Sequence, residues 1–224
     1  MNNICIIPAR GGSKRIPRKN VKEFLGKPII AYSIEAALKS RLFEEVMVST
    51  DDQVIAEIAK QYGASVPFMR SAETANDFAT LADVIDEVVD KYKAIGKGYD
   101  YFCCILATAP FVNASLLADS YNFFIEKNFD TLRPITTFGY PIQRAYRKDD
   151  SGCVSFMYPE YSSTRSQDLE VAYHDAGLFY WGKTASGLRG TIRGGYVINE
   201  DICQDIDTDN DWRLAELKYG LLMS

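Results

Sequence analysis

Short apolar runs and segments with helical spacing alternate along the first half of the chain. Three short runs are rich in β-forming apolar residues: residues 4–7, 45–49 and 99–106. Such runs are typical of strands that are buried in a sheet. Four segments repeat their apolar residues at helical spacing: residues 29–39, 54–62, 81–92 and 116–125. Strands that alternate with helices of about 10–12 residues predict a mostly parallel sheet covered by helices on both faces.

Local signals mark the ends of the second and third of these helices. We expect Thr50 or Asp51 to cap the second helix, because their side chains can accept hydrogen bonds from the first turn. We expect Gly63 to end the same helix and Thr80 to cap the third. Residues 65–69 are predicted to form a short strand. The pattern therefore predicts an α/β fold with a Rossmann-like sheet.

The second half of the chain departs from this alternation. Residues 131–138 continue the strand pattern, but residues 139–176 have no helical period and contain turn signals and scattered aromatic residues. A structureless loop of this length is uncommon inside a compact domain. We therefore predict a β-rich arm over residues 139–176 that leaves the body and packs elsewhere. Strands at residues 177–181 and 195–206 and a helix at residues 210–222 are expected to complete the fold.

The composition is that of a globular protein with one large domain. The chain has 224 residues and a mass of 25.2 kDa, with 47% hydrophobic and 25% charged residues. It fits a single domain over residues 1–224 with the arm as an insertion. The five cysteines form no C-x-x-C pair, and the longest apolar stretch, residues 101–112, is far below the roughly 20 residues needed to cross a bilayer. We expect a soluble, cytoplasmic protein that does not act at a membrane.

Charge is distributed unevenly along the chain. The 25 basic and 30 acidic residues leave a formal net charge of -5, which argues against a nucleic-acid binder. The first 22 residues nevertheless contain no carboxylate and six basic side chains: Arg10, Lys14, Arg15, Arg18, Lys19 and Lys22. A concentrated cationic segment on an acidic protein indicates a small anionic ligand.

The loop after the first predicted strand is the first candidate site. Its sequence is Pro8-Ala9-Arg10-Gly11-Gly12-Ser13-Lys14-Arg15. Two adjacent glycines let backbone N–H groups turn toward an anion, and the basic side chains add positive charge. The loop is neither a Walker A motif nor a G-x-G-x-x-G motif. We interpret it as a phosphate-binding loop, and the alternative is a solvated basic turn.

The acidic stretch at residues 205–211 is the second candidate site. If the chain is extended up to Asp207, the carboxylates of Asp205 and Asp207 project from the same face. Two such carboxylates suit Mg²⁺, which is bound by one or two carboxylates together with substrate phosphates. A calcium loop is an alternative, because Glu216 stands eleven residues after Asp205. A third interpretation is an acidic start of the last helix.

Three further residues carry weaker signals. Arg70 and Arg165 can bind an anionic ligand, but either can equally be an ordinary surface cation. His174, the only histidine, lies beside Asp175 and invites the role of a general base. A single histidine in an arm is more often structural or a hydrogen-bonding partner.

Several motifs resemble one family of enzymes. Residues 6–20, Ile-Ile-Pro-Ala-Arg-Gly-Gly-Ser-Lys-Arg-Ile-Pro-Arg-Lys-Asn, are similar to the N-terminal signature of the acylneuraminate cytidylyltransferases, the CMP-sialic acid synthetase family. The resemblance continues at residues 48–51, 70–80, 107–110 and 204–208, and so covers essentially the whole chain. Within this family, the chain looks most like the pseudaminic acid cytidylyltransferases.

The resemblance implies a nucleotide-diphospho-sugar transferase type of fold and a nucleotidyltransferase activity. The enzyme would transfer CMP from CTP to the anomeric hydroxyl of a nine-carbon sugar acid and release pyrophosphate, with Mg²⁺ as cofactor. The product would serve cell-surface or flagellin glycosylation. The resemblance also implies a homodimer in which the arm of one protomer completes the sugar site of its partner.

The resemblance assigns roles to individual residues. The nucleotide would be bound by Ala9, Arg10, Gly11, Gly12, Ser13, Lys14, Lys19, Asn20, Arg70, Asp77 and Thr80. The catalytic residues would be Lys14, Arg10 and Asp207, and Asp205 with Asp207 would hold the metal. The sugar acid would be bound by Arg165, Gln167, His174 and Asp175.

Departures from the family pattern bear on the choice of sugar. Leu106 and Val112 stand where sialic acid synthetases generally have glutamine and arginine, and residues 174–177 replace an Arg-Pro-Asn-Gly stretch. These changes favour pseudaminate over N-acetylneuraminate. Three alternatives stay open: a sister enzyme for legionaminate, N-acetylneuraminate or an octulosonate, a transferase that uses UTP or dTTP, and a non-catalytic nucleotide-binding module.

Overall fold

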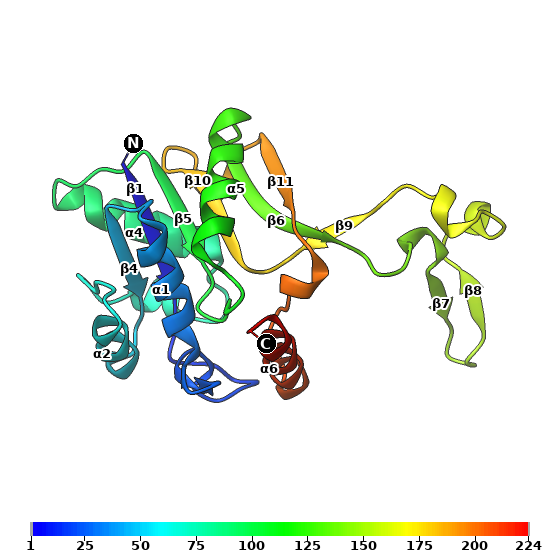
Figure 1. Ribbon diagram of the computed structural model, residues 1–224, viewed down its shortest axis with the longest axis horizontal. Coiled ribbons are helices and arrows are strands. Elements are labelled where there is room, and N and C mark those ends of the chain that lie inside the picture. The colour runs from blue at the N-terminus through cyan, green and yellow to red at the C-terminus, as the bar shows by residue number, and fades with distance from the viewer. Residues whose placement is uncertain (1, 224) are drawn as a thin grey trace.

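The central sheet of the body is built around strand β1 (Asn3–Pro8), which lies between two parallel neighbours (Figure 1). The computed structural model describes residues 2–223 of the chain, without the side chain of residue 223. The strands of this sheet are ordered β11-β6-β10-β5-β1-β4, and β9 pairs with β6. Their bounds are β4 (Glu45–Ser49), β5 (Tyr101–Ile105), β6 (Thr131–Thr137), β9 (Tyr173–Asp175), β10 (Phe179–Lys183) and β11 (Arg193–Val197). The antiparallel strands β9 and β10 make the sheet mixed.

Helices cover both faces of the sheet, as the sequence predicts. Cys5 and Ile7 pack on one face with apolar residues of α1 (Ile29–Ser40), α2 (Gln53–Gln61) and α5 (Ala114–Glu126). Ile4 and Ile6 pack on the opposite face with α4 (Leu81–Ala94). The side chains of β1 alternate because successive residues of a strand point to opposite faces. Both sets are fully buried, and each of the three isoleucine side chains contributes about 1.5–3 kcal/mol to stability.

The remaining elements are short or lie at the edges. Helix α3 (Ala72–Ala75) precedes α4, and β2 (Glu23–Phe24) pairs with β3 (Lys27–Pro28). The C-terminal helix α6 (Asp209–Met223) packs Trp212 and Ala215 against Ile16 and Phe24, so it closes a third cluster beside the basic loop. No helix within residues 2–223 is long and apolar enough to cross a membrane.

The capping predictions are confirmed at two positions and wrong at one. Thr80 and Asp83 form a capping box at the start of α4, and Gly63 follows α2 with a φ of 93°. Helix α2 is capped by Asp52, however, and not by Thr50 or Asp51. The Asp52 carboxylate accepts hydrogen bonds from the backbone N–H groups of residues 54 and 55, at 2.9 and 3.0 Å.

Two predicted strands are wrong or shortened for local reasons. The strand expected at residues 65–69 is reduced to a single bridge between Met47 and Ser65, and Pro67 has no N–H to continue the ladder. The strand expected at residues 195–206 ends at Val197. Beyond it, the Asn199 side chain accepts from the N–H of residue 201 and starts a 3₁₀ helix, a competing local bond that ends the extended chain.

The predicted arm projects from one end of the body (Figure 1). It contains a hairpin formed by β7 (Tyr146–Lys148) and β8 (Val154–Phe156). The Asp149 carboxylate organises the hairpin turn by accepting from the Ser151 hydroxyl and the N–H of Cys153. Strand β9, although inside the range predicted for the arm, pairs with β6 and therefore belongs to the central sheet.

Candidate active site

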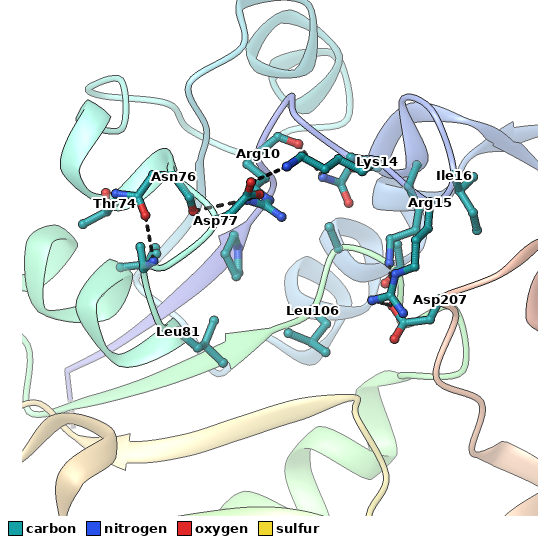
Figure 2. Close-up of a pocket in the computed structure, with 18 of the residues that line it drawn as sticks. Arg10, Lys14, Arg15, Ile16, Thr74, Asn76, Asp77, Leu81, Leu106 and Asp207 are labelled. Carbon is teal, nitrogen blue, oxygen red and sulfur yellow. Dashed lines mark hydrogen bonds and ion pairs between the residues drawn. The ribbon is translucent and has the colours of Figure 1, made fainter.

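A cavity of about 560 Å³ opens beyond the carboxyl end of β1, where open α/β sheets usually bind their ligands (Figure 2). The basic loop, the segment around α3, the turn after β5 and the acidic stretch before α6 all contribute to its walls. Eight of the residues predicted to bind nucleotide line this cavity: Arg10, Ser13, Lys14, Lys19, Asn20, Arg70, Asp77 and Thr80. The proposed metal ligands Asp205 and Asp207 line it as well.

The glycine pair does not face the cavity in this structure. The N–H of Gly11 donates to Oδ1 of Asp51 at 2.9 Å, and neither Gly11 nor Gly12 lines the cavity. A Cβ on Gly11 would come within 2.8 Å of Asp52 Oδ2, so only glycine fits this close approach. Ala9 is buried, and its N–H donates to the carbonyl of Ser49 at 2.9 Å. Ala9, Gly11 and Gly12 therefore determine the path of the loop backbone. The side chains of Arg10, Ser13 and Lys14 reach the cavity.

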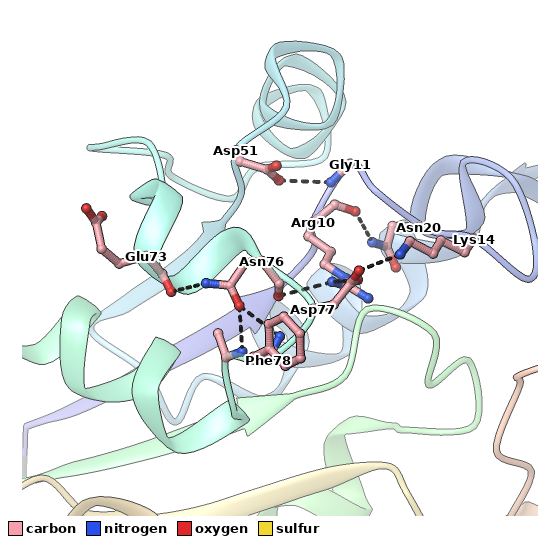
Figure 3. Close-up of polar contacts among 10 residues, drawn as sticks. Arg10, Gly11, Lys14, Asn20, Asp51, Glu73, Asn76, Asp77 and Phe78 are labelled. Atoms are coloured by element: carbon pink, nitrogen blue, oxygen red, sulfur yellow. Dashed lines mark hydrogen bonds and ion pairs between the residues drawn. The ribbon is translucent and has the colours of Figure 1, made fainter.

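Asp77 forms ion pairs with Arg10 and Lys14, two of the cations predicted to bind the nucleotide (Figure 3). Its Oδ1 accepts from Nη1 of Arg10 at 2.7 Å, and its Oδ2 accepts from Nζ of Lys14 at 2.5 Å. The same Arg10 nitrogen also donates to the carbonyl of Asn76 at 3.1 Å. The hydrogen bonds from Lys14 and Arg10 hold the pKa of Asp77 below its usual range.

A second charged group faces this one across the cavity (Figure 2). Oδ1 of Asp207 lies 2.9 Å from Nη2 of Arg15 and 3.4 Å from Nζ of Lys19. No ion pair within residues 2–223 involves Asp205. Partial desolvation raises the pKa of Asp205, and the negative charge of Asp207 raises it further, although the residue as a whole is exposed.

The two carboxylates fit a magnesium ion. Repulsion between Asp205 and Asp207 would be relieved by a divalent cation, and hard oxygen ligands are those that Mg²⁺ prefers. No group of three or more His, Cys, Asp or Glu residues in the described chain is arranged to hold a metal by itself. Phosphate oxygens and water would therefore supply the other ligands, as is usual for Mg²⁺. Residues 203–207 are irregular and not a strand, yet both carboxylates reach the same cavity.

The calcium-loop interpretation is wrong. Helix α6 begins at Asp209, four residues after Asp205, so the segment that an EF-hand would keep as a loop is helical. Asp211 instead accepts from the Thr208 hydroxyl and the N–H of Asp207, at 2.8 and 3.1 Å, and so stabilises the start of the helix. The acidic residues after Asp207 are thus part of the helix start.

Arg70 is built into the wall of the cavity. The residue is only 8% exposed, and it donates from Nε to the Ser49 hydroxyl at 3.1 Å and from Nη2 to the Ser49 carbonyl at 2.6 Å. Burial lowers its pKa, and the nearby carboxylates of Asp51 and Glu87 oppose that effect. The interpretation of Arg70 as an ordinary surface cation is therefore wrong.

The four residues predicted to bind the sugar acid lie outside this cavity. Arg165 pairs with Asp168 at 2.7 Å in the arm, where Gln167 also lies. The ring of His174 packs against that of Phe138, with ring centroids 4.9 Å apart. Asp175 pairs with Arg133 at 3.1 Å and accepts from the N–H of Gly177 at 2.9 Å, so it holds β9 in place. A single chain therefore does not bring these four side chains to the nucleotide residues.

Several cavity residues were not predicted as site residues. They include Thr74, Asn76, Leu81 and Val84. Asn76 has a recognisable signal, because an Asn followed by Asp just before a helix start favours a turn. Its side chain accepts from the N–H groups of Phe78 and Ala79, at 2.8 and 2.9 Å, and this turn presents Asp77 to the cavity. The apolar residues give no such signal, because a cavity wall and a core have the same composition.

Comparisons with known proteins agree with this geometry. A family model described as cytidylyltransferase matches residues 4–180. A pseudaminic acid cytidylyltransferase of Campylobacter jejuni is 42% identical over 224 residues, which cover 98% of this chain and 97% of that protein. An N-acylneuraminate cytidylyltransferase of Escherichia coli is 31% identical over 219 residues, which cover 95% of this chain and 51% of the relative.

A solved structure with a similar fold is that of a CMP:2-keto-3-deoxy-manno-octonic acid synthetase complexed with CTP. It superposes with a TM-score of 0.70 at 17% identity and covers 100% of this chain and 99% of that one. This likeness confirms the predicted fold class. With the family model and the relatives, it leads to one conclusion: the chain belongs to the cytidylyltransferase family and is a nucleotidyltransferase.

Proposed function

We propose that this enzyme transfers CMP from CTP to the anomeric hydroxyl of a nonulosonic acid, with pseudaminate as the preferred acceptor. The observation that carries the proposal is a single cavity lined both by the cations Arg10 and Lys14 and by the carboxylates Asp205 and Asp207. Arg10 and Lys14 suit the leaving pyrophosphate, and the pair of carboxylates Asp205 and Asp207 suits a metal. The likeness to pseudaminic acid cytidylyltransferases over nearly the whole chain supports the choice of acceptor.

The reaction is an in-line displacement at the α-phosphorus of CTP. The oxygen of the anomeric hydroxyl forms the new bond to the α-phosphorus, and its proton passes to solvent water. The bond between the α-phosphorus and the oxygen that bridges to the β-phosphorus breaks, and pyrophosphate leaves with that oxygen. Arg10 and Lys14 stabilise the negative charge that develops on the departing pyrophosphate. A magnesium ion bound by Asp205 and Asp207 would add charge neutralisation and polarise the phosphate. Placement and electrostatics supply most of the acceleration in such reactions.

The sugar site is proposed to be shared between two protomers. Arg165 suits the carboxylate of a sugar acid because its guanidinium can form two parallel hydrogen bonds, and Gln167 and His174 can donate to or accept from hydroxyl and acylamino groups. These side chains lie in or beside the arm, away from the cavity of their own chain. The arm exposes large apolar side chains, including Tyr140, which is 88% exposed, and Val154. Pairing with a second copy of the chain would bury these apolar side chains. The cytoplasmic location of the protein stays a prediction.

Leu106 is one of the departures from the sialic acid synthetase pattern that bear on the acceptor. Its side chain lines the cavity, whereas Val112 is buried and does not. The backbone of Leu106 is fixed on both sides, because its N–H donates to the Leu178 carbonyl at 2.9 Å and its carbonyl accepts from the Ser33 hydroxyl at 2.8 Å. An apolar side chain on a fixed backbone favours a substrate with an apolar group at this point.

A pyrophosphate-release assay tests the proposal. We would combine CTP, UTP or dTTP with pseudaminate, legionaminate, N-acetylneuraminate or an octulosonate in the presence of Mg²⁺. The expected result is release of pyrophosphate with CTP, fastest with pseudaminate. Faster release with another acid would identify a sister enzyme, and preference for UTP or dTTP would refute the nucleotide assignment. Binding of CTP in a calorimeter without turnover of any acid would indicate a non-catalytic module.

A further inference from the structure

Every basic side chain of the first 22 residues forms an ion pair with a carboxylate from elsewhere in the described chain. The pairs are Arg10 and Lys14 with Asp77, Arg15 and Lys19 with Asp207, Arg18 with Asp52, and Lys22 with Asp209. Six cations share four carboxylates, so the segment keeps a net positive charge, but each cation already has a carboxylate partner. An incoming polyphosphate must share or replace these carboxylates.

Asp77 is placed to take part in such an exchange. Its carboxylate pairs with both cations that we assign to the leaving pyrophosphate, and it stays 43% exposed at the cavity. The turn that carries it is well ordered by hydrogen bonds (Figure 3): Asn76 donates to the carbonyl of Glu73 at 2.7 Å and accepts from the N–H groups of Phe78 and Ala79. The turn ordered by Asn76 therefore holds the Asp77 carboxylate beside Arg10 and Lys14.

A carboxylate and a phosphate compete for the same donors. Both are anions, and bringing them together at Arg10 and Lys14 adds repulsion between like charges. We propose that Asp77 is an internal competitor for pyrophosphate: it pairs with Arg10 and Lys14 in the free protein, yields them to the triphosphate, and takes them back as pyrophosphate leaves. Asp77 is then a positioning residue that acts through the two cations. This inference rests on the proposed function, because it assigns the two cations to the leaving group.

Calorimetry with inorganic pyrophosphate tests the competition directly. We would titrate pyrophosphate into the full chain as wild type, Asp77→Asn and Asp90→Asn. Asp90 is an exposed residue of α4 that pairs with Lys93 at 3.6 Å, so its replacement makes the same change of net charge away from the cavity. We expect Asp77→Asn to bind pyrophosphate about tenfold more tightly than wild type, because two exposed ion pairs no longer have to be broken. Asp90→Asn should bind as wild type does.

Steady-state kinetics distinguishes competition from a structural role. Competition predicts that Asp77→Asn lowers the KM for CTP and also lowers kcat, because pyrophosphate leaves more slowly. Asp77→Glu, which keeps the charge, should restore kcat toward the wild-type value. A merely structural role predicts weaker binding of both CTP and pyrophosphate, with a raised KM. Unchanged or weaker pyrophosphate binding by Asp77→Asn would overturn the proposal.

Amide exchange on the wild-type protein supplies a measurement that needs no variant. Arg10 also donates to the Asn76 carbonyl at 3.1 Å, so its transfer from this turn to pyrophosphate should loosen the turn. The N–H groups of Phe78 and Ala79, which donate to the Asn76 side chain, should then exchange faster when pyrophosphate is bound. Unchanged or slower exchange in this turn would contradict the displacement.

Failure of the competition and failure of the proposed function can be distinguished. If the wild-type protein turns over CTP while Asp77→Asn gains no affinity for pyrophosphate, only the competition is refuted. A wild-type protein without turnover refutes only the proposed function, because the pyrophosphate titrations can still be compared.

Discussion

Replacement of Lys14 by alanine is expected to lower kcat/KM for CTP at least a hundredfold, while the melting temperature stays nearly constant. The Lys14 side chain is 76% exposed, and Asp77 keeps its bond to Arg10 when the lysine is lost. An exposed ion pair contributes about 0–1 kcal/mol to folding, so the fold loses little. Loss of one preorganised donor to developing charge costs about 2.7–4 kcal/mol, which corresponds to about 10²–10³ in rate.

The assay is pyrophosphate release at saturating sugar acid with varied CTP, together with thermal unfolding of each variant. Lys39→Ala is the matched control, because Lys39 is 72% exposed, pairs with Glu35 at 3.3 Å on α1 and does not line the cavity. It should keep wild-type kinetics. A Lys14→Ala enzyme with near-normal kcat/KM would remove the basic loop from the chemistry. A large fall in its melting temperature would show that the lysine acts through the fold.

The other predictions concern the metal, the assembly, the sugar site and acid stability. Asp205→Asn and Asp207→Asn should each abolish magnesium-dependent turnover, and a wild-type enzyme that stays fully active in EDTA would refute the metal assignment. Sedimentation should give a homodimer, and an active monomer near 25.2 kDa would exclude a shared site. Arg165→Lys should raise the KM for the sugar acid with little change in the KM for CTP, and His174→Ala should reduce discrimination between pseudaminate and neuraminate; unchanged values on both sugars would contradict this placement. Burial alone would raise the pKa of Glu87, but hydrogen bonds from Lys91, Thr74 and the N–H of Ser71 outweigh it and lower the pKa to about 2. A carboxylate whose pKa is lower in the folded than in the unfolded protein stabilises the fold at every pH above the unfolded pKa. Glu87→Gln should therefore lower the free energy of unfolding by about 2 kcal/mol at pH 7. In urea unfolding, the difference from wild type should shrink as the pH falls from about 4.5 to 2.

The order of strands and helices in the body was largely predictable, because it depends on near neighbours in the sequence. A strand such as β1 requires only a short apolar run, and α4 requires only apolar residues at helical spacing after a capping threonine. The errors are equally local. Pro67 cannot continue a ladder, and the Asn199 side chain bonds to its own backbone where a strand was expected.

The candidate site was predictable only in part. The basic loop and the acidic pair stand out because charge is concentrated in each, and both line the same cavity. Leu81 and Val84 could not be assigned to the site, because an apolar side chain that faces a cavity has the same sequence pattern as one in the core. The sugar residues of the arm stay predictions, because one chain does not bring them to the nucleotide residues.

The sequence by itself determined the α/β architecture and the position of a cationic loop directly after the first strand. Only the tertiary structure decided which carboxylates face that loop. Lys14 meets Asp77 across 63 positions of sequence, and Lys19 meets Asp207 across 188. Hydrophobic periodicity acts between neighbours a few residues apart, so it can be read along the chain. Coulomb interactions depend on distance in space, and the chain must fold before Asp77 and Asp207 reach their cations.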